Sequence, residues 1–280
     1  KSRSSMGMAE RITRRQWIRL SAGTLLALGM WPGRLRADDL KSTGDFTFLV
    51  VNDLHFFDDE CWPWFEEAVG AMKVSAPDAE LCLLCGDLAD AGRPDQHLGV
   101  RDAFEKLSLP VYSTIGNHDY FDPTDRRSYE ETFKNQINYI FEHNGWQFVG
   151  IDSTERNAWQ DTKILPDTFK WLDKNLPKLD RRRPTILFTH FPLGAEVPMR
   201  PLNADDLLER FLDLHLGAVF CGHFHGYTER PFGKAVVTTD RCCSRVRANH
   251  DGSKEKGWFV CRADVAGQVT REFVEFKPLV

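Results

Sequence analysis

The stretch from Phe46 to His55 reads Phe-Thr-Phe-Leu-Val-Val-Asn-Asp-Leu-His. Its first six residues are apolar or β-branched, which predicts a buried strand, and this strand runs into two possible metal ligands, Asp53 and His55. Residues two apart share one face of an extended chain, so both side chains can bind one ion while the backbone stays extended. The stretch therefore predicts a strand that presents metal ligands at its carboxyl end.

The same order of apolar strand and polar ligand recurs further along the chain. Strands are predicted over 81–85, 111–115, 185–189 and 218–221, with a further one over 146–151. The polar clusters that follow them are Gly86-Asp87, Gly116-Asn117-His118-Asp119, His190 and Gly222-His223-Phe224-His225. Sites in open α/β sheets form at the carboxyl ends of strands, so we expect these clusters to converge on one crevice. A carboxylate such as Asp87 can bridge two cations there.

Helical periodicity fills the intervals between these strands. It is seen over 62–74, 97–107, 129–141, 167–176 and 205–215, and the alternation of strand and helix predicts a layered α/β domain. Three more strands are predicted in the tail, over 234–239, 258–263 and 269–276. A chain of 280 residues is long enough for one large domain of this kind.

The five polar clusters resemble the calcineurin-like metallophosphoesterase family. Over about residues 46–226 they meet its pattern D-x-H, G-D, G-N-H-D, H and G-H-x-H without a missing member, and residues 165–172 resemble a helix start of its phosphodiesterase branch. The resemblance implies a four-layer α/β/β/α sandwich with two mixed β-sheets, formed by a single domain over 38–280. It also implies a phosphoric ester hydrolase with two metal ions, for which Mn, Fe or Zn would suit the ligands.

The resemblance further implies a role for each matching residue. One metal would be held by Asp53, His55, Asp87 and His225, and the second by Asp87, Asn117, His190 and His223. A hydroxide bridging the two ions would attack phosphorus, with His118 beside the leaving group and Asn117 also close to the substrate.

Other polar residues leave alternatives open. Asp119 either orients His118 through a hydrogen bond as part of the catalytic set, or serves the turn of its own loop. The polar segment 239–252 either lies over the site, with Arg241, Arg245 and Arg247 binding substrate phosphate, or forms a solvated loop. Asp90 stands where purple acid phosphatases would have a metal-binding tyrosine, which argues against a member of that branch.

Residues 1–37 resemble a bacterial twin-arginine (Tat) signal peptide. Residues 13–18 contain Arg14-Arg15, an apolar run covers 20–31, and Leu35-Arg36-Ala37 offers a cleavage site. We expect export by the Tat machinery to the periplasm or beyond. A basic amphipathic helix or an anchor is the alternative, although the apolar run is shorter than the roughly 20 residues that span a bilayer.

Charge and cysteine usage narrow the function. Residues 38–280 hold 28 basic and 40 acidic residues, a net charge of −12, which disfavours a nucleic-acid partner. We expect hydrolysis of small phosphate esters, with phosphodiesters favoured; a phosphomonoesterase, a metal-dependent nuclease and a non-catalytic scaffold remain alternatives. Cys82 and Cys85 are predicted to be buried thiols, while a disulfide from Cys242 or Cys243 is left open.

Overall fold

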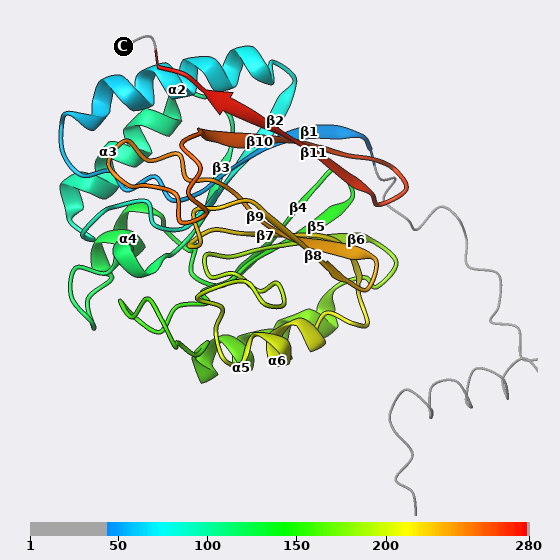
Figure 1. The fold of residues 1–280 in the computed structure, drawn as a ribbon. Coiled ribbons are helices and arrows are strands. Elements are labelled where there is room, and N and C mark those ends of the chain that lie inside the picture. Colours follow the sequence, from blue (N-terminus) through cyan, green and yellow to red (C-terminus); the bar gives the residue numbers. More distant parts are fainter. Residues whose placement is uncertain (1–43, 279–280) are drawn as a thin grey trace, which may run out of the picture. The chain divides into compact units, whose positions relative to one another are not determined.

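Two β-sheets lie face to face in the computed structural model, which describes residues 44–278 (Figure 1). The first sheet has the strand order β11-β10-β1-β2-β3, and the second has the order β4-β5-β6-β7-β9-β8. All described residues belong to one compact unit, residues 42–280. The predicted signal peptide, residues 1–37, lies outside the described residues. Within residues 44–278, no helix is long and apolar enough to cross a bilayer.

The first sheet is mixed. β2 pairs in parallel with β1 and β3, whereas β10 is antiparallel to both β1 and β11. Its strands are β1 (Phe46–Val51), β2 (Ala79–Cys85), β3 (Val111–Thr114), β10 (Lys256–Ala263) and β11 (Val269–Phe276).

The second sheet is also mixed. β5, β6, β7 and β9 run parallel to one another, and the edge strands β4 and β8 are antiparallel to their neighbours. Its strands are β4 (Tyr139–His143), β5 (Trp146–Gly150), β6 (Pro184–Phe188), β7 (His215–Cys221), β8 (Thr228–Phe232) and β9 (Ala235–Thr239).

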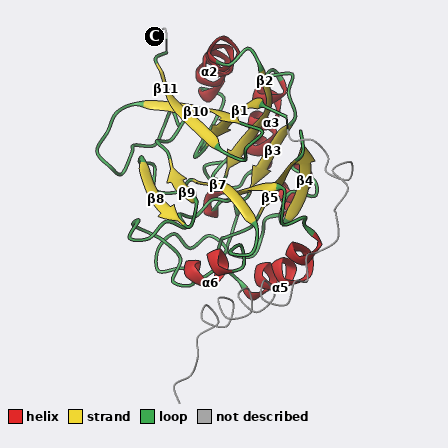
Figure 2. Ribbon diagram, turned by 90° about the vertical axis from the view of Figure 1, so that its right-hand side faces the viewer, coloured by secondary structure: helices red, strands yellow, loops and turns green. Residues whose placement is uncertain are grey.

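Helices cover the outer face of each sheet, as the two perpendicular views show (Figures 1 and 2). α2 (Cys61–Ser75) and α3 (Pro94–Glu105) pack on the first sheet, and α5 (Pro166–Asn175) and α6 (Ala204–Glu209) pack on the second. The short helix α4 (Arg127–Thr132) contacts α3. Both α3 and α5 begin with a proline, whose fixed φ and missing N–H suit the first helical position.

Alternation along β1 shows how the sequence builds these layers. Phe48 and Val50 point into a core between the two sheets, where they join Phe148 and Phe220 of the second sheet. Leu49 and Val51 face the helices α2 and α3 instead. A strand with both faces covered is apolar throughout, as β1 is. The expected four-layer α/β/β/α architecture with two mixed sheets is confirmed.

Two predicted helices were too long. The helix expected over 129–141 ends at Thr132, and residues 139–143 form β4 instead, because their aromatic side chains pack on the inner face of the second sheet: the Phe141 and Phe148 ring centroids lie 4.6 Å apart. The helix expected over 205–215 ends at Glu209, and β7 already begins at His215. Tertiary pairing overrides local periodicity at both places.

The seven cysteines are buried free thiols. Cys82 and Cys85 lie on β2 as predicted, and burial raises the pKa of the Cys82 thiol. The disulfide left open for Cys242 or Cys243 is not formed.

Candidate metal centre

The candidate metal centre lies where the carboxyl ends of strands from both sheets meet. The predicted ligands follow β1, β2 and β3 of the first sheet and β6 and β7 of the second. The main-chain N–H of Asp53 donates to Gly86 O (3.1 Å), and that of Gly222 donates to His190 O (2.7 Å). The main-chain N–H of His223 also donates to the Asp53 carboxylate at 3.0 Å, which links the two sheets at the site.

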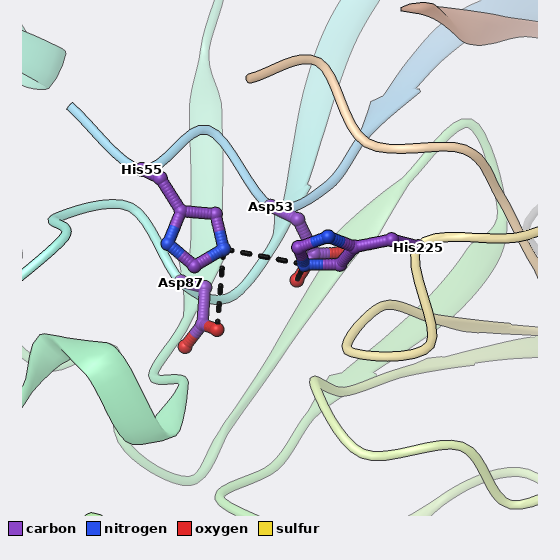
Figure 3. Close-up of side chains that lie close together, drawn as sticks. All are labelled: Asp53, His55, Asp87 and His225. Atoms are coloured by element: carbon purple, nitrogen blue, oxygen red, sulfur yellow. Dashed lines mark hydrogen bonds and ion pairs between the residues drawn. The ribbon is translucent and has the colours of Figure 1, made fainter. Parts of the chain in front are cut away.

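Four buried side chains form a first ligand group: Asp53, His55, Asp87 and His225 (Figure 3). The Nε2 atoms of His55 and His225 lie 3.2 Å apart, and His55 Nε2 lies 3.5 Å from Asp87 Oδ2. His225 Nε2 also lies 3.2 Å from Asp53 Oδ1. Ring nitrogens and carboxylate oxygens that face one another this closely are a donor set that suits a divalent cation.

A second group uses the other oxygen of Asp87. Its Oδ1 lies 3.3 Å from His190 Nε2, which lies 3.2 Å from His223 Nδ1 and 3.1 Å from Asn117 Oδ1. Asp87, His190 and His223 form a buried cluster with metal-binding spacing. The structure therefore brings all seven predicted ligands together, in two groups that share Asp87.

Three of the four candidate ligand histidines have the other ring nitrogen hydrogen-bonded from outside the cluster, and His55 has it beside a carboxylate without a hydrogen bond. This arrangement fixes the tautomer and turns the free nitrogen inward, as in metal-binding histidines generally. The outer contacts are His55 Nδ1 to Asp90 Oδ1 (3.2 Å), His190 Nδ1 to Cys85 O (3.0 Å), His223 Nε2 to Trp159 O (2.8 Å) and His225 Nδ1 to Ala248 O (3.0 Å).

The pKa values of the cluster favour the protonation states that bind metal. Burial alone would raise the pKa of Asp53 and Asp87, but the surrounding histidines outweigh it, lowering the pKa of Asp87 to about 2 and that of Asp53 further. Burial lowers the pKa of His55, and it lowers that of His223 to about 3. His225 is the exception, because the Asp53 carboxylate overcomes burial and raises its pKa. Anionic carboxylates and neutral imidazoles are the forms that bind a cation.

Five ligands adopt left-handed backbone conformations that non-glycine residues rarely occupy. Their φ values are 54° at Asp53, 46° at His55, 48° at Asp87, 65° at His223 and 44° at His225. The expectation that Asp53 and His55 share a face of an extended chain was therefore wrong: the chain leaves β1 after Val51 and turns sharply at both ligands. Strain of this kind concentrates at functional sites and costs on the order of 1–3 kcal/mol per residue.

Glycines beside the ligands permit close approach. A Cβ atom at Gly116 would lie 2.2 Å from both the main-chain N and Oδ1 of Asp87. One at Gly86, which has a φ of +78°, would lie 2.5 Å from the His190 ring. Gly116 is therefore needed for space, and Gly86 for both space and turn geometry.

Asp90 holds two residues of the site. Its carboxylate lies beside the outer nitrogen of His55, and its main-chain carbonyl accepts a hydrogen bond from His118 Nδ1 at 2.7 Å. The His118 ring lies 4.7 Å from the His55 ring, centroid to centroid, and lines the same cavity. His118 belongs to neither of the two groups that share Asp87, but it forms a third group of metal-binding spacing with His55 and Asp90.

Asp119 serves the loops and does not orient His118. Its carboxylate accepts hydrogen bonds from the main-chain N–H groups of Leu88, Ala89 and Gly116 at 2.8–2.9 Å. It also lies 3.1 Å from Nε2 of His97, which is a buried residue of α3. These contacts place the Asp119 carboxylate between the loops that carry Asp87 and Asn117, as the turn alternative expects.

The three arginines considered for substrate binding are separated by the structure. Arg241 stacks on Phe273 and bonds Ser253, and Arg245 pairs with Glu60 at 2.9 Å; neither lines the metal cavity. Arg247 does line it, and its Nη2 lies 2.6 Å from Asp90.

The cavity over the ligands has a volume of about 280 Å³ and includes residues that sequence reasoning missed. Trp159, Met199 and His250 line it together with the ligands. Trp159 and Met199 lie in the loops after β5 and β6 but outside any motif, so the sequence offers no signal for them. His250 lies in the polar segment 239–252 and could have been considered with its arginines.

Curated relatives share part of this chain. A protein of Synechococcus named as a probable cyclic nucleotide phosphodiesterase is 31% identical over 123 residues, which are 44% of this chain and 46% of that protein. The glycerophosphodiester phosphodiesterase of Enterobacter lignolyticus is 26% identical over 185 residues, covering 58% of this chain and 61% of its own. The chain thus spans about half to two thirds of the length of the first curated relatives that it matches.

Solved structures show the same fold at low identity. A purple acid phosphatase from yellow lupin has a TM-score of 0.65 at 12% identity, over 84% of this chain and 52% of its own. GAP50 of Plasmodium has a TM-score of 0.60 at 14% identity, over 85% of this chain and 88% of its own. The family model described as calcineurin-like phosphoesterase matches residues 46–227, which are well over half of the chain. The buried ligand groups lie within these residues. The chain belongs to the calcineurin-like phosphoesterase family, a family of metal-dependent phosphoric ester hydrolases.

Proposed function

We propose that the protein is an exported phosphodiesterase that uses two metal ions to hydrolyse small phosphodiesters. The observation that carries the proposal is the pair of buried ligand groups that share Asp87. One oxygen of this carboxylate faces each group, as a ligand that bridges two cations would. We further propose Mn, Fe or Zn as the ions, which suit a set of nitrogen and oxygen ligands without thiolate.

The preference for diesters rests on the relatives. Those from Synechococcus and Enterobacter are named for cyclic nucleotides and glycerophosphodiesters, both of which are phosphodiesters. A serine/threonine-protein phosphatase of Bos taurus, 25% identical over 205 residues, keeps a monoesterase as the alternative. The acidic body, with a net charge of −12 over 38–280, continues to disfavour a nuclease.

Protein side chains would position the ester and its protons. Two bound ions would lower the pKa of a water and polarise the phosphoryl oxygens. His118 donates from Nδ1 to the Asp90 carbonyl. With both ring nitrogens protonated, as imidazolium, it would give the Nε2 proton to the leaving oxygen and keep the Nδ1 hydrogen bond. Arg247 lines the cavity with N–H donors beyond those that bond Asp90, and can orient the phosphate or its organic group. Asn117, which contacts His190, would also lie close to the substrate.

Export is the part of the proposal that rests on residues 1–37 alone. Arg14-Arg15 and the apolar run after them support passage through the Tat machinery in the folded state, and a metal could then be acquired before export. Changing both arginines to lysine should retain the protein in the cytoplasm, as fractionation would show. Unchanged export of the double variant would contradict this part of the proposal.

The Asp87→Ala variant tests the site. Loss of the shared carboxylate should lower metal content in both ligand groups and reduce kcat/KM on bis-p-nitrophenyl phosphate by about 100-fold or more. Asp167→Ala, on the exposed start of α5, is the matched control and should retain both metal and activity. An Asp87→Ala variant that keeps two metals and full activity would refute the role of Asp87 as a shared ligand. The ratio of wild-type activity on bis-p-nitrophenyl phosphate to that on p-nitrophenyl phosphate decides between a diesterase and a monoesterase.

A further inference from the structure

Trp159 is an exposed tryptophan at the metal cavity. It is 58% exposed, whereas every other tryptophan in residues 44–278 is buried or half-buried. Within that range its indole has no stacking partner, no cation over its face and no hydrogen bond. An indole is a large apolar surface with one polar N–H, and a ring left open beside a cavity is poised to cover a ligand.

The main chain of Trp159 is hydrogen-bonded to a residue of the candidate metal centre. Its carbonyl oxygen accepts the hydrogen bond from His223 Nε2 at 2.8 Å, and His223 turns its other nitrogen toward His190. The residue therefore has two separable parts: a carbonyl that accepts from His223, and an exposed indole on a residue that lines the cavity. A substitution at this position removes the ring and leaves the carbonyl.

The loop that carries Trp159, residues 151–165, is held on both sides of the ring. Before it, the N–H and hydroxyl of Thr154 donate to Asp152 Oδ1 at 2.8 and 2.6 Å. After it, the N–H of Lys163 donates to Glu155 Oε2 at 2.8 Å, and Thr162 O accepts from the N–H of Leu202 at 2.9 Å. A ring on a preorganised loop pays less ordering entropy when a ligand binds.

The other residues that line the cavity near Trp159 also suit the organic group of a phosphoester. Met199 lines the same cavity and offers a polarizable thioether to aromatic groups. Arg247 and His250 supply the polar part of the wall, outside the residues 46–227 that match the family model. With only about 280 Å³ available, the organic group of an ester bound at the ligands must pass close to these side chains.

We propose that Trp159 is a specificity-determining residue whose indole packs against a planar aromatic group on the phosphoester. The inference rests on the proposed function for the position of the phosphoryl group. It predicts that esters with an aromatic organic group bind in preference to those with a small alkyl group.

Phenylphosphonate and methylphosphonate test the ring without turnover, since they share the head group and differ in the organic part. Calorimetry on the metal-loaded full chain should give about tenfold tighter binding of phenylphosphonate. Trp159→Ala should remove most of this preference, Trp159→Phe should keep part of it, and both should retain wild-type metal content. Phe121→Ala, an aromatic residue that is 59% exposed and lies outside this cavity, is the matched control and should keep the preference.

Two results would overturn the inference. A preference that survives in Trp159→Ala would show that the ring makes no contact, and an equal loss for both phosphonates would show a distorted site. Absence of hydrolysis of both p-nitrophenyl esters by the metal-loaded wild type would instead contradict the proposed function, and it is measured separately from this binding comparison.

Discussion

Asp90 contacts two residues of the candidate metal centre although it is not one of the seven predicted ligands. Its carboxylate contacts both the outer nitrogen of His55 and the Arg247 guanidinium, and its carbonyl holds His118. Burial alone would raise the pKa of Asp90, but His55 and Arg247 outweigh it and lower that pKa, so the carboxylate stays anionic. A carboxylate behind a ligand histidine fixes the ring and increases its basicity.

Asp90→Asn should therefore weaken metal binding without removing a ligand. We expect metal affinity to fall by about 10- to 100-fold, as is usual when such a partner is lost. Competition with a chelator measures it, and Asp95→Asn on the exposed start of α3 is the control. An unchanged affinity in Asp90→Asn would show that its contact with His55 is incidental.

His223 should make the stability of the metal-free protein depend on pH. Burial lowers its pKa from 6.5 to about 3, so below pH 6.5 the unfolded chain binds a proton that the folded chain does not. This contribution to stability is present above pH 6.5 and is lost as the pH falls toward 3. Between pH 7 and pH 5 the wild type should lose about 2 kcal/mol more unfolding free energy than His223→Gln. Urea unfolding after chelation measures the unfolding free energy of the wild type and of His223→Gln at each pH. An equal loss of unfolding free energy in the two proteins would contradict a lowered pKa at His223.

Among the secondary-structure elements, the turns after the strands hold the candidate ligands, and glycines in these turns let the chain segments approach closely. Gly116→Ala should destabilise the protein and lower metal content, because its Cβ would overlap the main chain of Asp87. Gly70→Ala on α2 is the matched control, since nothing lies within 4 Å of its Cβ, and it should stabilise the helix by about 0.5–1 kcal/mol. Thermal unfolding and metal analysis compare the two; if Gly116→Ala behaved like Gly70→Ala, the close approach would have no importance.

The strands and their polar ends could be predicted from the sequence, whereas the backbone between ligands could not. β11 was predicted residue for residue, because its alternation is local, and all seven ligands converge because each follows a strand. The left-handed turns at ligands such as Asp53 and His55 depend on tertiary contacts, as does the conversion of residues 139–143 into β4. Asp119 likewise bonds three main-chain groups from two separate loops, which no local pattern reveals.

At the scale of the molecule, the ligands join two sheets that otherwise meet through an apolar core. Four candidate ligands follow strands of the first sheet (Asp53, His55, Asp87 and Asn117), and three follow strands of the second (His190, His223 and His225). The candidate ligands are therefore divided between the two sheets. A cation held by ligands from both would link the sheets at the end where the strained ligand backbone lies.

Removing metal should consequently destabilise both sheets together. A ligand at 100 times its dissociation constant stabilises the folded state by about 2.7 kcal/mol, so chelation should lower Tm by about 5–10 °C in a domain of this size. Hydrogen exchange should accelerate together at the carboxyl ends of β2 and β7. The Asp87→Ala variant is the control and should show little shift on chelation, because it lacks the carboxylate shared by the two groups. Faster exchange at only one of the two strands would contradict a centre held by both sheets, because a shared cation must release β2 and β7 at the same time.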